Sequence, residues 1–194
     1  MESISPREQI LQTTSQLLET QGYHGTGLNQ IIKESGSPKG SLYYYFPEGK
    51  KEIAAEAIRH SAMLTAQRIQ ANLDTKEDWI ESLRIFSHSI AHHIEQSDFR
   101  AGGPLQAVAV ETAATDEYLN TSCRNAYETL RLPFEEKLLA GGFTPDQAAS
   151  YSMLILTMLE GAILISRTYH NGGPLRQTGD ELAKLLRSIQ PANA

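Results

Sequence analysis

Residues 28–46 read LNQIIKESGSPKGSLYYYF, and this stretch decides the fold of the chain. Leu28, Ile31 and Ile32 stand at positions i, i+3 and i+4, so a helix over them carries its apolar side chains on one side. A turn that contains glycine and a second apolar segment follow. The stretch therefore predicts two short helices around a tight turn.

Three consecutive residue types predict the turn itself. Gly36 can end the first helix with a positive φ. Ser37 suits the N-cap of the second helix, and Pro38 suits its first position, where no backbone N–H is needed. We expect the second helix to stop at Pro47. Two helices joined in this way are typical of the helix-turn-helix motif, whose second helix enters the major groove of DNA.

The rest of the chain also predicts helices, because no strand-like alternation of apolar and polar residues occurs in it. Thr26 is expected to cap the second helix, and the sequence Thr144-Pro145-Asp146-Gln147 predicts a capping box at the start of a later one. We therefore predict an all-α protein of about nine helices, at approximately residues 6–22, 27–35, 38–46, 50–73, 74–96, 105–112, 116–140, 145–170 and 174–189.

The long helix expected at residues 50–73 joins two domains. Its apolar pattern continues without a break, with Ile53, Ala57, Met63 (or Leu64) and Ile69 facing inward. We expect an N-terminal helix-turn-helix domain over residues 1–50 and a larger helical domain over residues 51–194, so that one rigid helix leads from one domain into the other.

Composition indicates a soluble, cytoplasmic protein. Hydrophobic residues make up 40% of the 194 residues and charged residues 21%, which is enough for a large core and argues against disorder. The first residues lack the basic start and apolar segment of a signal peptide. The most apolar stretch, Met153 to Ile165, is interrupted by Glu160 and is too short to span a membrane. Cys123 is the single cysteine, which excludes an internal disulfide.

The charge of the chain constrains how it can bind DNA. The net charge is −6, whereas residues 29–51 carry four lysines against two glutamates and are therefore positive by two. Nucleic-acid-binding proteins usually have a stronger basic region. We expect low non-specific affinity, so specific binding would require contacts with base edges and dimerisation.

The N-terminal pattern resembles the TetR family of bacterial transcriptional repressors. The residues that carry the resemblance, in the order and spacing of the family, are Ile10, Leu11, Leu17, Gly22, Thr26, Ile31, Gly36, Lys39, Gly40, Leu42, Tyr43 and Phe46. The C-terminal part is similar to the LmrA/YxaF-like branch through Gly103-Pro104-Leu105, Glu111, Glu160-Gly161-Ala162, Arg167 and Pro174-Leu175.

This resemblance implies a ligand-responsive repressor without enzymatic activity or cofactor. A homodimer would bind a pseudo-palindromic double-stranded DNA operator. The C-terminal domain would bind a small, aromatic or hydrophobic effector and hold the two subunits together. Effector binding would tilt the connecting helix, change the separation of the two recognition helices and release the DNA.

The resemblance also implies which residues contact DNA. Lys39 and Gly40 would approach base edges, Thr26 would bind phosphate, and a lysine at the start of the fourth helix would bind phosphate. The chain has Pro47-Glu48-Gly49 where the family has one residue fewer, so either Lys50 or Lys51 fits this role. The expected DNA-contacting residues are Thr26, Ser37, Lys39, Gly40, Ser41, Tyr43, Tyr44, Tyr45, Lys50 and Lys51.

Two further residue sets are expected in the larger domain. Glu160 lies in an apolar helix, where it could pair with Arg167 or Arg124, cross the dimer interface or bind the effector. The expected effector pocket comprises Met63, Phe86, His88, His92, Leu105, Val108, Tyr127, Phe134, Met153, Leu156 and Glu160. The expected dimer interface comprises Tyr151, Ile155, Leu159, Ile163, Leu182 and Leu186.

Other functions fit the sequence less well. His88 and His92 are spaced to face each other on a helix, but the HExxH pattern is absent and no metal is expected. The sequence contains neither a Gly-x-Ser-x-Gly elbow nor a phosphate-binding loop, so these motifs give no indication of an enzyme. A helical protein-interaction adaptor without DNA binding is the alternative.

Overall fold

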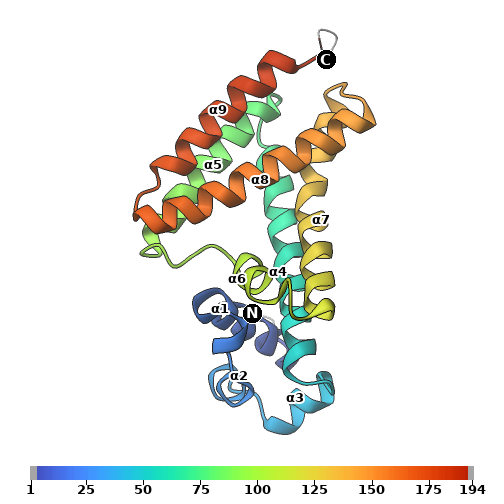
Figure 1. Ribbon diagram of the computed structural model, residues 1–194, viewed down its shortest axis with the longest axis vertical. Coiled ribbons are helices and arrows are strands. Elements are labelled where there is room, and N and C mark those ends of the chain that lie inside the picture. Colours follow the sequence, from blue (N-terminus) through green and yellow to red (C-terminus); the bar gives the residue numbers. More distant parts are fainter. Residues whose placement is uncertain (1–3, 192–194) are drawn as a thin grey trace. The chain divides into compact units, whose positions relative to one another are not determined.

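The computed structural model describes residues 4–191, and within that range it contains nine α-helices and no strand (Figure 1). The predicted all-α class with about nine helices is confirmed. The helices are α1 (Pro6–Gly25), α2 (Leu28–Ser35), α3 (Lys39–Tyr45), α4 (Lys50–Leu73), α5 (Trp79–Gln96), α6 (Pro104–Thr112), α7 (Glu117–Ala140), α8 (Pro145–Tyr169) and α9 (Gly173–Ile189).

The turn between α2 and α3 forms around a left-handed glycine, as predicted. Gly36 has φ 65° and ends α2. The predicted cap of α3 is wrong, however, because the N-cap position falls to Pro38 and no side chain caps the helix. Ser37 lies one residue too early, and its hydroxyl is buried with no hydrogen-bond partner among residues 4–191. The start of α3 is closed instead by backbone bonds to the Pro38 carbonyl from Ser41 and Leu42, at 2.9 and 3.3 Å.

Thr26 also differs from its predicted role as a cap of α2. The N-cap of α2 is Gly27, and no side chain caps this helix. Gly22 has φ 72° and interrupts the regular part of α1, which frees its carbonyl for another donor. The Thr26 hydroxyl donates to that carbonyl at 2.7 Å. The Thr26 hydroxyl therefore supplies a hydrogen-bond donor to a carbonyl group near the end of α1. The Thr26 side chain is buried rather than directed at the next helix.

The long helix α4 begins and ends where the sequence predicts. Ile53, Ala57 and Ile69 are buried in it, as expected. Met63 was expected to point inward but is 44% exposed. Leu64, the alternative, is 45% exposed as well, and the residue buried at this point of α4 is Ala62.

Helix α5 begins later than the predicted residue 74 or 75. Asp78 is its N-cap, and its carboxylate accepts the backbone N–H groups of Ile80 and Glu81, each at 3.1 Å. At the start of α8 the predicted capping box is confirmed. The Thr144 hydroxyl accepts from the Gln147 N–H at 3.3 Å, and the Gln147 side chain accepts from the Thr144 N–H at 3.0 Å.

The described chain forms two compact units. Unit 1 contains the chain up to Met63 together with Gly103–Tyr127, and unit 2 contains Leu64–Gly102 and the chain from Glu128 onward. This division differs from the predicted boundary at residue 50, because α6 packs along α1 and joins the helix-turn-helix unit. Both α4 and α7 run from one unit into the other as continuous helices.

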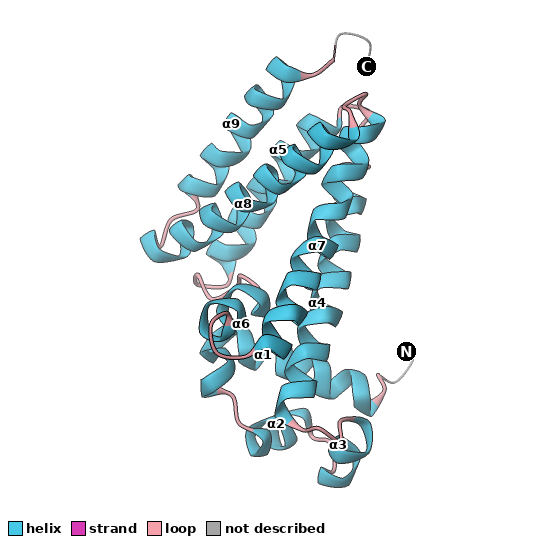
Figure 2. Ribbon diagram, turned by 45° about the vertical axis from the view of Figure 1, so that its right-hand side comes forward, coloured by secondary structure: helices cyan, strands magenta, loops and turns pink. Residues whose placement is uncertain are grey.

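In unit 2, α5 and α9 lie side by side, as the two views agree (Figures 1 and 2). Gly179 on α9 permits this approach. A Cβ atom built on it would lie 2.5 Å from the Cβ of Ser87 on α5 and 3.5 Å from the Arg84 carbonyl oxygen. The two helices are therefore closer at this point than a pair of alanines would allow.

We expect Gly179→Ala to lower the thermal unfolding midpoint, because overpacking of this kind costs about 1–3 kcal/mol. The measurement is thermal unfolding followed by circular dichroism. Ser87→Gly removes the opposing Cβ and should restore part of the loss when it is combined with Gly179→Ala. A double variant no more stable than Gly179→Ala alone would show that the close approach is not the cause.

Candidate nucleic-acid interface

Helix α3 presents one polar and aromatic face to solvent. Lys39 and Gly40 are exposed, Tyr43 is 45% exposed and Tyr44 is 80% exposed. An added Cβ at Gly40 would meet no atom within 4 Å, so the backbone there is open to a large partner. Leu42, on the opposite side of the helix, is fully buried. The predicted residues Lys39, Gly40, Tyr43 and Tyr44 therefore share the exposed side of one short helix.

The other residues predicted at this interface are less accessible. Ser41 is half-buried, and so is Tyr45, whose ring stacks edge-to-face with the Tyr44 ring at 5.1 Å between centroids. Ser37 and Thr26 are 5% and 1% exposed. Because their hydroxyls are enclosed by the chain itself, we remove Ser37 and Thr26 from the set of expected side-chain contacts with DNA.

The two lysines at the start of α4 have different environments. The ammonium of Lys50 lies 4.2 Å from the centre of the Tyr23 ring, and burial lowers the pKa of Lys50. Burial also disfavours the charged form of the Tyr23 phenol, and it therefore raises the pKa of that group. Lys51 is exposed and forms an ion pair with Asp116, at 2.6 Å from Nζ to Oδ2. Both lysines therefore already have partners within unit 1.

Two carboxylate contacts that were not predicted from the sequence join α6 to α1. The N–H of Gly103, at the start of α6, donates to Glu19 Oε1 at 2.7 Å. The N–H of His24, at the end of α1, donates to Glu111 Oε2 at 2.8 Å. These pairs are distant in sequence and follow no local pattern, so only the packing of α6 on α1 could have indicated them.

The residues predicted to form an effector pocket are divided between the two units. In unit 2, Phe86, Phe134 and Leu156 are buried, whereas Met153 and His92 are exposed. In unit 1 the remaining predicted residues are Leu105 and Val108, which are buried, Tyr127, which is half-buried, and Met63, which is exposed. Because Met63, Met153 and His92 are exposed, we remove these three from the expected pocket residues.

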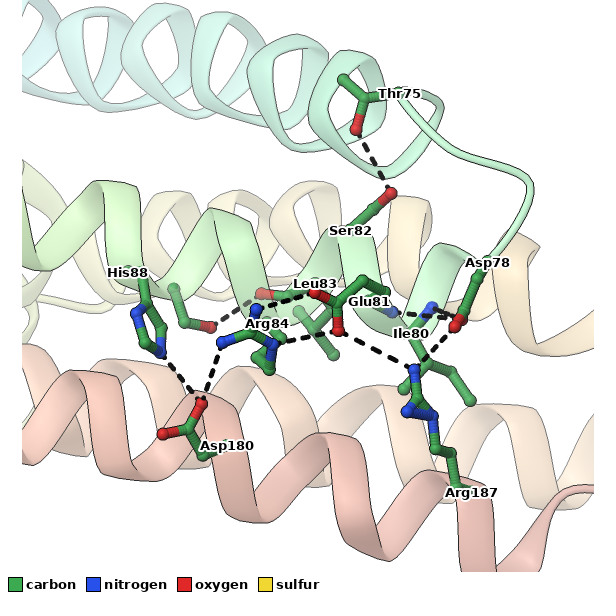
Figure 3. A network of polar contacts seen from close by, with 11 residues as sticks. Thr75, Asp78, Ile80, Glu81, Ser82, Leu83, Arg84, His88, Asp180 and Arg187 are labelled. Atoms are coloured by element: carbon green, nitrogen blue, oxygen red, sulfur yellow. Dashed lines mark hydrogen bonds and ion pairs between the residues drawn. The ribbon is translucent and has the colours of Figure 1, made fainter.

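His88 lies on the surface between α5 and α9 rather than in an enclosed site (Figure 3). Its Nε2 is 3.0 Å from Asp180 Oδ1, and Arg84 lies 3.4 Å from the same oxygen while also pairing with Glu81. His88 therefore belongs to a polar network between two helices. Within residues 4–191, no group of three or more His, Cys, Asp or Glu side chains is arranged to hold a metal ion.

Glu160 on α8 is a carboxyl group in an apolar environment. Burial raises its pKa to about 7. The two arginines considered as its partners make other contacts, since Arg124 pairs with Glu117 at 2.6 Å and the Nε of Arg167 donates to the Phe99 carbonyl at 3.2 Å. A carboxyl group held near neutrality in an apolar helix can accept or donate a hydrogen bond at physiological pH.

The residues predicted for a dimer interface need correction. Ile155, Leu159, Leu182 and Leu186 are at most 4% exposed because the chain itself covers them. Tyr151 and Ile163 are half-buried. The apolar side chains that α8 and α9 expose are instead Met153, Leu154, Leu164, Ile165 and Leu185. Because α8 is apolar on nearly all sides, its sequence could not tell which face meets the chain's own core.

Helix α8 is also long and apolar enough to cross a membrane by length and composition alone. This is weak evidence for a span, because the core helix of a soluble protein passes the same test. Here one face of the helix is buried against unit 2, through Ile155, Leu159 and Ala162. This packing accounts for the apolar residues on that face of α8.

Comparison with known proteins identifies both parts of the chain. Residues 10–57 match the model of bacterial regulatory proteins of the TetR family, and residues 80–181 match the LmrA/YxaF-like transcriptional regulator C-terminal domain. The chain is 39% identical to the HTH-type transcriptional regulator YxaF of Bacillus subtilis over 181 residues, which cover 93% of this chain and 95% of that protein. The chain belongs to the TetR family.

Within the TetR family, the chain is also similar to the LmrA/YxaF-like members by sequence. It is 38% identical to the HTH-type transcriptional regulator LmrA of Bacillus subtilis, over 93% of this chain and 96% of that protein. The TetR-family chain is therefore a transcriptional regulator with an N-terminal DNA-binding domain and not an enzyme. The alternative of an adaptor without DNA binding is set aside.

Solved structures of TetR-family regulators share the fold. A regulator from Legionella pneumophila superimposes with a TM-score of 0.80 at 16% identity, over 95% of this chain and 99% of that one. The reduced form of NemR from Escherichia coli gives a TM-score of 0.78 at 21% identity, over 96% and 98%. At these identities the likeness establishes the TetR fold alone.

We expect Glu160→Gln to make this regulator more stable at pH 8 and to leave it nearly unchanged near pH 4. The folded-state pKa is raised, so the protonated form is favoured by folding. That contribution is complete below about pH 4.5 and is lost as the pH rises through about 7. The rise from 4.5 to about 7 corresponds to about 3 kcal/mol in the free energy of unfolding. Unfolding midpoints measured from pH 4 to 8 check this.

Glu136→Gln is the matched control, because Glu136 lies on the exposed side of α7. Its unfolding midpoint should follow that of the wild type at every pH. If Glu160→Gln follows the wild type equally closely, then the environment of Glu160 does not disfavour the charged carboxylate.

Proposed function

We propose that this TetR-family regulator is a ligand-responsive repressor whose homodimer binds a pseudo-palindromic operator. The observation that supports this most is the exposed face of α3, which carries Lys39, Gly40, Tyr43 and Tyr44. Such a helix fits the major groove, where a lysine bonds guanine O6 and N7 and tyrosine hydroxyls bond phosphate. Repression then follows from occupancy of the operator.

The proposed DNA contacts divide by role. Lys39 reads base edges, and the open backbone at Gly40 lets the helix approach the groove closely. Tyr43, Tyr44 and Ser41 contact the backbone or thymine methyl groups. The partly buried Tyr45 supports Tyr44 from behind. A lysine of the first turn of α4, Lys50 or Lys51, contacts phosphate.

The weak positive charge of this face makes dimer geometry decisive. With a net charge of −6 for the chain, few phosphates are neutralised and non-specific affinity is low. Two recognition helices bind one duplex together only when their separation is about 34–36 Å or a multiple of it. Two correctly spaced copies of α3 supply the affinity that one copy lacks.

The exposed apolar face of α8 and α9 is the proposed dimer interface. Leu154, Leu164 and Ile165 on α8 and Leu185 on α9 are each between 38% and 51% exposed. Leu154 and Ile165 stand eleven positions apart, which places them on one side of the helix, and Gly161 between them leaves room for close packing. An apolar stripe of this length is covered in solution when two copies pair.

The effector in this proposal is a small aromatic or hydrophobic molecule. Phe86, Phe134 and Leu156 supply apolar and aromatic surface in unit 2, and Glu160 supplies one polar group of perturbed pKa. Ligand pockets combine these features, with apolar walls and few polar groups. An effector that binds the released state about 100-fold more tightly shifts the equilibrium away from DNA by about 2.7 kcal/mol.

The proposed location is the cytoplasm, where bacterial operators are found, and the protein needs no membrane. Its partners are the DNA operator, the effector and a second copy of the chain. This is consistent with similarity to bacterial HTH-type transcriptional regulators over almost the whole chain.

We expect Lys39→Ala to weaken operator binding by about 1–3 kcal/mol, because it removes a base contact. Tyr43→Phe should weaken it by about 0.5–1.5 kcal/mol through the loss of one hydroxyl bond. Neither change should alter the unfolding midpoint, since both side chains are exposed. Gel shifts with duplexes that the purified protein selects from a random pool provide the measurement, and Lys76→Ala, an exposed lysine of unit 2, is the control. Unchanged affinity in both variants would contradict the assigned roles.

We expect Leu164→Glu to produce a monomer, because a charge is placed on the proposed dimer interface. Sedimentation equilibrium measures the mass, and the same samples should lose most of their operator affinity. Val110→Glu is the matched control, since Val110 is 81% exposed on α6 and lies outside the interface. A Leu164→Glu protein that remains dimeric would rule out this face.

A further inference from the structure

One ion pair ties the start of α4 to the start of α7. Lys51 Nζ lies 2.6 Å from Asp116 Oδ2. The other carboxylate oxygen, Oδ1, accepts the N–H of Leu119 at 3.1 Å and closes the first turn of α7. The bond between them lowers the pKa of Asp116 and raises that of Lys51, so both groups are charged at neutral pH. Asp116 therefore closes the first turn of α7 with one oxygen and pairs with Lys51 of α4 through the other.

The two neighbouring lysines differ in how easily they can change partner. Lys50 is partly buried, with its ammonium 4.2 Å from the Tyr23 ring centre, and Glu111 adds a favourable charge. Lys51 has a side chain that is 48% exposed. The ion pair is open to solvent on the lysine side, whereas the Asp116 side chain is 17% exposed, so an anion that reaches Lys51 from solvent can take the place of the carboxylate. Lys51 is therefore the lysine that can exchange its partner.

We propose that Asp116 is a positioning residue that holds Lys51 away from the DNA, so that the loop between α6 and α7 competes with an operator phosphate for one ammonium group. This inference rests on the proposed DNA binding. Lys51 stands on the first turn of α4, five residues after Phe46 at the end of the recognition helix. A long lysine side chain at that place turns either toward Asp116 or toward the phosphate backbone.

The competition gives the loop over residues 113–116 an influence on DNA affinity. When Asp116 stays close to α4, binding of phosphate must first break the ion pair. When the loop moves the carboxylate away, Lys51 is free to neutralise a phosphate, and counterions are released from the DNA. Affinity for any duplex then rises, because a phosphate contact does not depend on sequence.

The test is Asp116→Asn in the full-length protein. Asparagine caps helices as well as aspartate does, so α7 should keep its start. We expect binding to become about two- to fivefold tighter at 50 mM salt, the range that an exposed ion pair spans. The slope of log affinity against log salt should steepen by about 0.9 per protomer, the value for one further phosphate contact. Fluorescence anisotropy with a labelled duplex that the purified protein selects from a random pool measures both.

Two controls separate the pair from a general effect of charge. Glu117→Gln removes the same charge from the adjacent residue, whose carboxylate pairs with Arg124 rather than with α4. It should leave the salt slope unchanged. Adding Lys51→Ala to Asp116→Asn should abolish the gain. Asp116→Ser, which also keeps a capping hydroxyl, should reproduce the gain if the asparagine variant folds poorly.

The outcomes are distinct. A wild-type protein that binds no duplex at 50 mM salt overturns the proposed function and this inference with it. A wild-type protein that binds DNA while both Asp116 variants match Glu117→Gln overturns the positioning role alone. A gain that persists without Lys51 also overturns it, because the effect would then come from the overall charge.

Discussion

The direction of the recognition helix depends on the burial of one aromatic ring. Phe46 follows α3 and is 1% exposed. The guanidinium of Arg7 on α1 lies 5.5 Å from the centre of this ring, and Arg7 also pairs with Glu56 on α4 at 2.7 Å. Burial of such a ring stabilises by about 1.5–3 kcal/mol. A helix of seven residues has little stability of its own, so α3 keeps its direction only because Phe46 and Leu42 hold it against its neighbours.

Charge within unit 1 is arranged to join helices more than to attract DNA. Lys51 pairs with Asp116, Lys50 lies over an aromatic ring, and Glu19 and Glu111 accept backbone groups from α6 and α1. Only Lys39 and Lys33 remain on exposed positions of the helix-turn-helix. A regulator built in this way gains little from non-specific attraction, and its selectivity therefore depends on shape, spacing and a few contacts with base edges.

The sequence predicted the helices well because their boundaries are set locally. Gly36, the Thr144 capping box and the break before Lys50 are all features of a few adjacent residues. The caps at Thr26 and Ser37 were wrong by one residue, since Gly22 and Pro38 changed the local geometry in ways that only the backbone reveals. Side-chain partners distant in sequence, such as Lys51 and Asp116, have no local pattern at all.

The exposed side of a helix can be predicted from the sequence only where apolar residues identify its buried side. The exposed side of α3 could be predicted because Leu42 and Phe46 identify its buried side. Helix α8 offered no such contrast, so its sequence could not show that Ile155 and Leu159 are buried within the chain. The effector residues depend on which side chains meet across several helices, and periodicity in one helix does not contain that information.

The exposed apolar face of α8 has a consequence for the cell that makes this protein. In the proposed dimer, that face is covered only after two chains meet, so the supply of competent regulator rises with roughly the square of chain concentration when the protein is scarce. Control of the target genes would then switch on at a threshold of synthesis rather than in proportion to it.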